Sequence, residues 1–399
     1  MIRKLFHGIS CVVIAVLKPL KTYAYRTRFF FVRGLILEIT TLIDWLMIFF
    51  NIQNNIMLLH QKIYGGNFLF GQAVMITDYD TTARDITKPL FKCNHFMGVD
   101  IIANQSSVFG MNAGSLNQCP PLRASSRAMM DATVFTEELA AQGYEQVKAE
   151  CAGILEEWAA DPKMAGMWSI RGTATRIFLK VLSGTLVSKE DADYSTKKYV
   201  THFGELSIFG RYLPSVNGLL GSHKFIRKEA YFRLKEKYDI DMGIIDMTLF
   251  AAMFSVGTLL IRCVEDIQTW KIPYGELDYE KKRNFIFEVQ RLWPTVTSVH
   301  RIVERDETVR IGNRELKLTP GDEVVYPFIC SNRDESTFDE PKTMKLDRPA
   351  EEYERVLSWS KGPHACPGKE ISIDVTLVML DELARHHDLS RLKIFNPTF

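Results

Sequence analysis

The sequence predicts a mainly α-helical protein with a small β portion. Apolar residues recur with helical spacing over long stretches, at roughly 121–160, 165–185, 224–268 and 278–292. Strand-like segments are short and lie in two places, at 68–79 and 308–328. The hydrophobic fraction of 46% and the charged fraction of 24% are those of a globular protein, so a disordered chain is excluded.

Charge and cysteine usage exclude further classes of protein. The 399 residues include 49 basic and 48 acidic ones, a net charge of +1, which argues against binding of nucleic acid through bulk charge. None of the 7 cysteines lies within four residues of another, so no C-x-x-C zinc or redox pair is present. Six of them are expected to be mostly buried free thiols in a reducing compartment, and Cys366 is the exception.

The N-terminal region, residues 1–37, has basic but no acidic residues. Its charge-free run Leu5–Leu17 is shorter than the ~20 residues that span a bilayer. Three alternatives remain: a basic amphipathic segment on an anionic membrane surface, a cleaved organelle-targeting peptide, or a helix packed on the domain. We expect residues 1–62 to form a separate membrane-associated or targeting segment, in an intracellular location such as the endoplasmic reticulum or another organelle.

The compact part of the chain begins near Gly65. Phe68–Tyr79 predicts two short strands around a glycine turn, and Asp80–Ile86 predicts the start of a helix. The later strands, at 308–328, surround a turn at 319–322. A last amphipathic helix is expected from about Pro367 to His387.

The stretch from Trp359 to Lys369 carries the clearest chemical signal. Glycines bracket a loop that places Cys366 at the start of the last helix, with Pro367 at the first helical position. The free N–H groups and the dipole at that end would stabilise a thiolate. Such a thiolate is suited to act as a nucleophile or as the axial ligand of a haem iron. The alternative is an ordinary turn with a buried cysteine.

The spacing aromatic-x-x-Gly-x-x-x-Cys-x-Gly, from Trp359 to Gly368, resembles the haem-binding loop of the cytochrome P450 superfamily. Trp359 stands where most members have Phe. The resemblance implies a P450-like fold and a catalytic domain over 63–399, with haem b bound through the Cys366 thiolate. The part after Cys366 is shorter than in the family, so we expect the C-terminal β hairpin to be missing.

Two further segments resemble the same family in the same order. The first is the E-x-x-R sequence Glu288–Arg291 on an apolar helix face, and the second runs from Asn332 to Pro349. The resemblance implies that Glu288 and Arg291 form a buried pair that Arg348 completes. Elsewhere in this chain an E-x-x-R spacing is most simply a solvated helix pair.

The remaining cofactor contacts follow from the resemblance alone. It implies that Trp359, Gly362 and Gly368 line the haem in the cysteine loop. It also implies that the haem propionates bind cations or donors, for which the candidates in this chain are Arg123, Arg127, Arg301 and His364. The alternative for each of these four is plain surface charge.

The segment at 249–258 departs from the family. It occupies the place of the Ala-Gly-x-Asp/Glu-Thr helix, where Ser255 or Thr258 would supply the catalytic hydroxyl. Neither hydroxyl follows a carboxylate, because Phe254 precedes Ser255 and Gly257 precedes Thr258. Proton delivery needs a group within hydrogen-bond reach, so ordinary splitting of O₂ becomes less secure.

These observations favour a haem-thiolate monooxygenase that acts on a lipophilic small molecule, either a lipid or a secondary metabolite. A reductase would supply electrons on the face nearest Cys366, with Lys361 and Lys369 as candidate contacts. One alternative is a fatty-acid hydroperoxide isomerase, dehydratase or lyase of the same fold, which needs no reductase. Another is a truncated or degenerate relative without enzymatic activity. A membrane surface is an expected partner, and nucleic acid is not.

Overall fold

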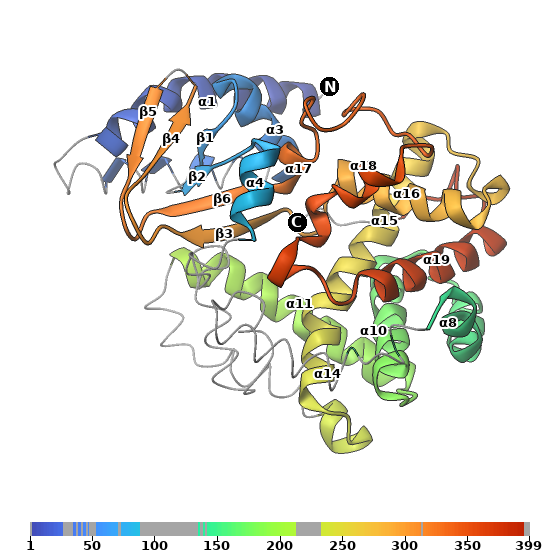
Figure 1. Cartoon of the computed structure of the whole chain (residues 1–399). Coiled ribbons are helices and arrows are strands. Elements are labelled where there is room, and N and C mark those ends of the chain that lie inside the picture. The colour runs from blue at the N-terminus through green and yellow to red at the C-terminus, as the bar shows by residue number, and fades with distance from the viewer. Residues whose placement is uncertain are drawn as a thin grey trace.

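The computed structural model describes residues 2–26, 53–70, 73–87, 142–212, 233–312 and 314–394, with single residues or pairs between 35 and 47 and at 135 and 139. Figure 1 shows a β portion on one side of the molecule and a larger helical portion on the other. The predicted fold class, mainly α with a small β part, is confirmed.

The β portion consists of one four-stranded sheet and one hairpin. The sheet has the order β1-β2-β6-β3, from β1 (Phe68–Phe70), β2 (Ala73–Met75), β6 (Glu323–Pro327) and β3 (Ser298–Ile302). Its central pair, β2 and β6, is parallel, while β1 and β3 are antiparallel to their neighbours. The hairpin joins β4 (Glu307–Ile311) to β5 (Arg314–Leu318). Strands from both ends of the chain therefore share one sheet.

Two N-terminal helices, α1 (Ile2–Arg26) and α3 (Gln53–Tyr64), pack beside strand β1. The inner face of α1 buries Ile14 and Leu17 at 1% and 8% exposure. Lys21 lies on the same face, is fully buried, and donates hydrogen bonds to the Asp44 carboxylate and to the Leu69 carbonyl oxygen. Burial lowers the pKa of the Lys21 ammonium, and Asp44 partly offsets this.

The helical portion is built around α15 (Met253–Trp270), which packs against α10 (Met167–Ser183), α16 (Tyr279–Leu292) and α19 (Lys369–His386). Among the described residues, Met242–Trp270 is the one helix long and apolar enough to cross a membrane, but 69% of its most apolar window is buried inside the protein. Its apolar surface is explained by packing in the core.

The remaining helices are shorter or lie at the periphery. They are α4 (Tyr79–Asp85), α8 (Tyr144–Glu150), α9 (Ala152–Ala159), α11 (Lys189–Tyr212), α14 (Met242–Asp246), α17 (Phe328–Ser331) and α18 (Ala350–Glu354). Trp293 and Trp359 pack against the cores of both portions, so they lie at the junction between them.

The continuous helix predicted over 224–268 is wrong. Asp239 has a left-handed backbone with φ of 52°, and the Asp241 side chain then caps α14 by accepting from the Gly243 N–H at 2.7 Å. A π-helical turn, Met247–Ala252, joins α14 to α15. Asp at a helix start is favoured because its side chain competes for backbone N–H groups.

Candidate functional site

The loop between Trp359 and Lys369 holds Cys366 in a fixed position. The backbone N–H of Cys366 donates to the carbonyl oxygen of Trp359 at 2.8 Å, which closes the loop on itself. The side chain of Cys366 is exposed, whereas Cys151, Cys263 and Cys330 are buried. Burial raises the pKa of the Cys151 and Cys330 thiols to about 12, so both remain protonated at neutral pH. Among the described cysteines, Cys366 is the thiol placed to react or to bind iron.

The predicted start of the last helix needs a correction. α19 begins at Lys369 with Gly368 as its N-cap, while Pro367 and Gly368 form a turn before it. Pro367 is therefore not the first helical residue, and Cys366 lies before the cap rather than at it. Because dipole effects fall off within the first turn, α19 stabilises a Cys366 thiolate less than the sequence analysis predicted.

Gly362 lies where a side chain would not fit well, whereas Gly368 has room for a Cβ. Gly362 has a φ of +58°, and a Cβ there would lie 3.0 Å from the Cγ2 atom of Thr87. A Cβ on Gly368 would lie 3.4 Å from the ring of Phe135. Gly362 thus allows the end of α4 to approach the cysteine loop closely.

Arg301 on β3 approaches the same place from the sheet. It is 2% exposed, and its Nη2 atom donates to the carbonyl oxygen of Ile86 at 3.3 Å. The next residue, Thr87, is the one that contacts Gly362. His364 is half-buried in the same loop. The structure therefore brings two of the predicted propionate-binding residues to one region, while Arg123 and Arg127 lie outside the described residues.

The segment expected to activate oxygen spans the π-helical turn and the start of α15. Ala251, Ser255 and Thr258 have helical spacing and share one face; Ser255 is half-buried and Thr258 is exposed. The residues from Met247 to Thr258 include no carboxylate. Within this segment the buried Oγ1 of Thr248 has no hydrogen-bond partner among the described residues. Such π turns are frequent at functional sites, and the sequence did not predict this one.

Another contact beside this segment was missed. Arg171 on α10 lies over the Phe254 ring at 5.2 Å, and a Cβ on Gly257 would lie only 2.8 Å from the Arg171 side chain. Burial lowers the pKa of Arg171. Gly257 therefore serves close packing of α10 on α15, which explains why no larger residue stands there.

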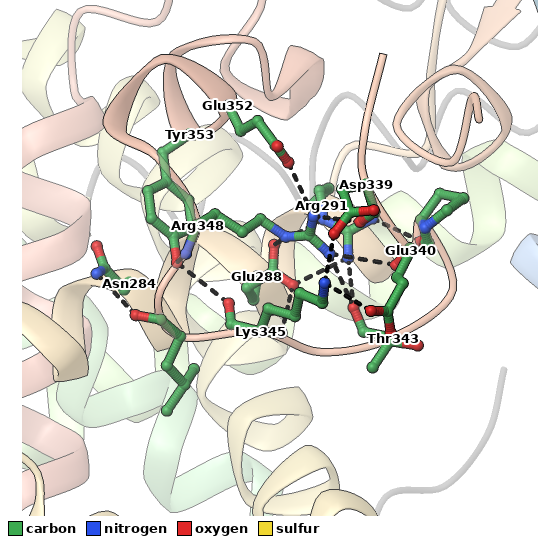
Figure 2. Close-up of polar contacts among 12 residues, drawn as sticks. Asn284, Glu288, Arg291, Asp339, Glu340, Thr343, Lys345, Arg348, Glu352 and Tyr353 are labelled. Carbon is green, nitrogen blue, oxygen red and sulfur yellow. Dashed lines mark hydrogen bonds and ion pairs between the residues drawn. The ribbon is translucent and has the colours of Figure 1, made fainter. Parts of the chain in front are cut away.

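Glu288, Arg291 and Arg348 form a buried charge network (Figure 2), with exposures of 0%, 0% and 1%. Arg291 donates to both carboxylate oxygens of Glu288, at 2.6 and 2.9 Å. The Nε atom of Arg348 donates to the same carboxylate at 2.9 Å. These three residues were predicted to meet, and the structure joins them in a bidentate pair with a second guanidinium beside it.

The network fixes the segment 332–348 on α16. Arg291 donates to the carbonyl oxygens of Asn332, Pro341 and Thr343, at 3.1, 2.6 and 2.9 Å. Glu352 also accepts from Arg348 at 2.8 Å, a contact that the sequence analysis missed although the i,i+4 spacing permits it.

A chain of hydrogen bonds leads from this network to the cysteine loop. Asn332 donates to the Ser358 hydroxyl at 2.9 Å and accepts from the Leu357 N–H at 2.9 Å. Ser358 in turn donates to the carbonyl oxygen of Gln290 on α16 at 2.6 Å. The carbonyl oxygen of the next residue, Trp359, accepts a hydrogen bond from the Cys366 N–H. The charge network on α16 therefore positions the loop that carries the thiol.

Asp266 belongs to a second buried cluster, at the end of α15. Its Oδ1 accepts from Arg262 at 3.0 Å, while its Oδ2 has no partner among the described residues. Arg262 also pairs with Glu265 at 2.7 Å and stacks on Trp293 at 4.0 Å. Burial raises the pKa of Asp266 to about 6, which Arg262 only partly offsets.

Asp266→Asn is expected to stabilise the protein at pH 8. Because the pKa is raised in the folded state, the wild-type protein gains stability as the pH falls through about 6 towards the unfolded value. The variant should therefore be more stable at pH 8, on the order of 2 kcal/mol, and lose that advantage near pH 4. Urea unfolding at both pH values measures this.

Glu265→Gln is the control for that comparison. Glu265 pairs with the same Arg262 but is 46% exposed, so its replacement should change the unfolding free energy little at either pH. Equal effects of the two variants at pH 8 would contradict the origin assigned to the raised pKa of Asp266.

Comparisons with known proteins agree with this geometry. The cytochrome P450 family model matches residues 282–391, which include most of α16, the charge network and the cysteine loop. Over 75 residues the chain is 36% identical to linoleate 10R-lipoxygenase of Aspergillus fumigatus; the match covers 19% of this chain and 6% of that protein. The chain thus spans only a small part of the curated relative.

Solved structures match over most of the chain. The haem domain of a Tepidiphilus thermophilus P450 has a TM-score of 0.60 at 17% identity and covers 83% of this chain and 86% of its own. A thermophilic P450 from Sulfolobus tokodaii has a TM-score of 0.57 at 17% identity, with 81% and 89% covered. P450BioI, bound to an acyl carrier protein that carries hexadec-9Z-enoic acid, has 0.59 at 14% identity, with 78% and 85% covered. The chain therefore has the cytochrome P450 fold, and its residues 282–391 match the model of the cytochrome P450 family.

Proposed function

We propose that this protein is a haem-thiolate monooxygenase that acts on a lipophilic small molecule, with Cys366 as the ligand of the haem iron. The observation that carries the proposal is the exposed Cys366 thiol in a glycine-bracketed loop. That loop is held to α16 by the hydrogen bonds of Asn332 and Ser358.

The residues of this region fit the haem that the family implies. An accessible thiol suits an axial ligand, which must reach the metal as a thiolate. Gly362 and Gly368 carry no side chain of their own beside the thiol, and Thr87 and Phe135 occupy the space next to them. Arg301 and His364 provide cationic or donating groups for two propionate carboxylates.

When bound, haem supplies the redox chemistry, and electron donation by its thiolate ligand favours O–O cleavage. The protein holds the Cys366 backbone through the Trp359 carbonyl, which fixes the direction of the sulfur atom. Ser255 and Thr258 provide hydroxyl groups on one face of α15, where they can hold a water and pass on a proton.

The carbon monoxide difference spectrum of the reduced protein tests the ligand assignment. A thiolate-ligated haem gives a band near ~450 nm, as expected for this family. Absence of this band from haem-loaded protein would exclude a thiolate ligand and with it the proposed activity.

Electron transfer needs a separate partner, and we propose a reductase at the face nearest Cys366. Lys361 already donates to the Tyr79 hydroxyl at 3.0 Å, which weakens its candidacy as a docking contact.

A second reaction deserves a direct comparison, because residues 247–258 offer no carboxylate for proton delivery. The alternative substrate is a fatty-acid hydroperoxide, which already contains the O–O bond and needs no outside electrons. Similarity to a linoleate-oxidising fungal enzyme supports a fatty-acid substrate for this alternative. Isomerisation conserves every atom, and dehydration releases one water.

Turnover without a reductase separates the two reactions. Haem-loaded protein is incubated with linoleic acid hydroperoxide in the absence of NADPH and reductase, and loss of the hydroperoxide is followed. For a monooxygenase we expect no turnover beyond that of free haem, but oxidation of linoleic acid once reductase and NADPH are added. Fast conversion to a single product without them would favour the hydroperoxide reaction.

The variant pair Ser255→Ala and Thr258→Val gives a second test of the monooxygenase. Loss of the hydroxyl that delivers protons is expected to lower product formed per NADPH roughly tenfold or more, while haem content stays constant. Replacement of the other hydroxyl should have little effect on the product formed per NADPH. The pair of variants therefore shows whether Ser255 or Thr258 delivers the protons. Unchanged coupling in both variants would contradict a proton-delivery role for either hydroxyl.

A further inference from the structure

The outer face of α1 is apolar from residue 8 to residue 24, where its side chains are described. Five large side chains are exposed at helical spacing: Ile9 at 48%, Val12 at 64%, Val16 at 59%, Leu20 at 44% and Tyr23 at 55%. We call these five residues the α1 stripe. The spacing of three and four places them on one side of the helix. Figure 1 shows α1 at the outer edge of the β portion.

Between residues 8 and 24 no charged side chain interrupts this face. The other exposed positions between residues 8 and 24 are Gly8, Ala15 and Pro19. Two lysines in this part of the helix are turned away from it: Lys21 is buried against Asp44, and Lys18 donates to the Ile63 carbonyl oxygen at 3.1 Å. The usual arrangement, with a polar side facing water, is therefore reversed in α1.

Such a face requires an apolar neighbour, because contiguous exposed apolar surface is rare on soluble proteins. The basic residues on either side of the stripe indicate which one. The sequence places Arg3 and Lys4 before it and Arg26, Arg28 and Arg33 after it, without any acidic residue up to position 37. Apolar side chains flanked by cations match a bilayer surface with anionic headgroups.

We propose that the α1 stripe docks on an anionic membrane surface, with the helix lying in the plane of the interface. A spanning orientation is ruled out because the inner face of α1 is fastened to the β portion through Ile14, Leu17 and Lys21. From Ile9 to Tyr23 the stripe is ~21 Å long at the rise of an α-helix.

Vesicle sedimentation of the full-length protein tests the proposal. We expect binding to vesicles of phosphatidylcholine with phosphatidylserine, and weaker binding to phosphatidylcholine alone or at high salt. Val16→Asp should weaken binding roughly tenfold or more, since it places a charge in the centre of the buried face. Circular dichroism and the haem spectrum of the variant should match the wild type, because Val16 is 59% exposed and is not part of the described core.

Leu186→Asp is the matched control. Leu186 has the same exposure as Val16, 59%, but lies between α10 and α11, so its replacement should leave vesicle binding unchanged. The proposal is overturned if the wild type does not bind either kind of vesicle, or if both variants lose binding equally. It is also overturned if the lipid-free wild type dimerises and Val16→Asp makes it monomeric, because the stripe then contacts a second copy of the chain.

Discussion

Cys366→Ser abolishes the thiolate signature of the haem protein. The oxygen of serine is a harder and more basic ligand than sulfur, so the reduced carbon monoxide complex should lose its band near ~450 nm. We expect the proposed monooxygenase activity to fall at least about 1,000-fold, since electron donation by the thiolate is lost. Difference spectra and turnover with a reductase measure both effects.

Cys11→Ser serves as the control for removal of a thiol. Cys11 is half-buried on α1, far in sequence from the cysteine loop, and its replacement should leave spectrum and activity unchanged. If both variants kept the band near ~450 nm, a residue other than Cys366 would have to bind the iron.

Glu288→Gln is expected to have the largest effect on stability. The change removes the one carboxylate shared by Arg291 and Arg348 and leaves the buried Arg291 guanidinium without a charged partner among the residues shown in Figure 2. Breaking such a buried pair costs about 3–5 kcal/mol, a large share of the roughly 5–15 kcal/mol that stabilise a folded protein. Urea unfolding should show this, together with loss of bound haem, because the cysteine loop depends on α16.

Glu335→Gln makes the same chemical change in an exposed pair. Glu335 bonds to Lys342 at 3.0 Å, and both side chains are about three-quarters exposed, so we expect a change of less than about 1 kcal/mol. Similar losses for the two variants would show that the buried network contributes no special stability.

Short-range patterns in the sequence predicted the parts of the site that lie within one segment. The glycine and cysteine spacing from Trp359 to Gly368 indicated the loop, and the apolar face of α16 distinguished Glu288 from the other E-x-x-R sequences. Family resemblance was needed to connect Arg348 to them. The spacing of charges alone does not determine whether a helix pair is buried.

Contacts between distant segments could not be predicted. The hydrogen bonds of Asn332 to Ser358 and of Arg301 to Ile86 join residues 26 and 215 positions apart. The break at Asp239 was missed because the apolar pattern continues on both sides of it, while the φ of 52° is set by the local turn. Helix α11 was missed because its charged first half has weak helical patterning.

The inward-facing lysine of α1 has a practical consequence for recombinant production. Removing residues 1–26 would delete Lys21, the lysine that pairs with the buried Asp44 carboxylate. It would also uncover the apolar surfaces of α3 and β1 on which α1 packs, so the exposed stripe of α1 would be replaced by another exposed apolar surface. Polar replacements in the α1 stripe preserve this anchoring and are the better route to a soluble protein.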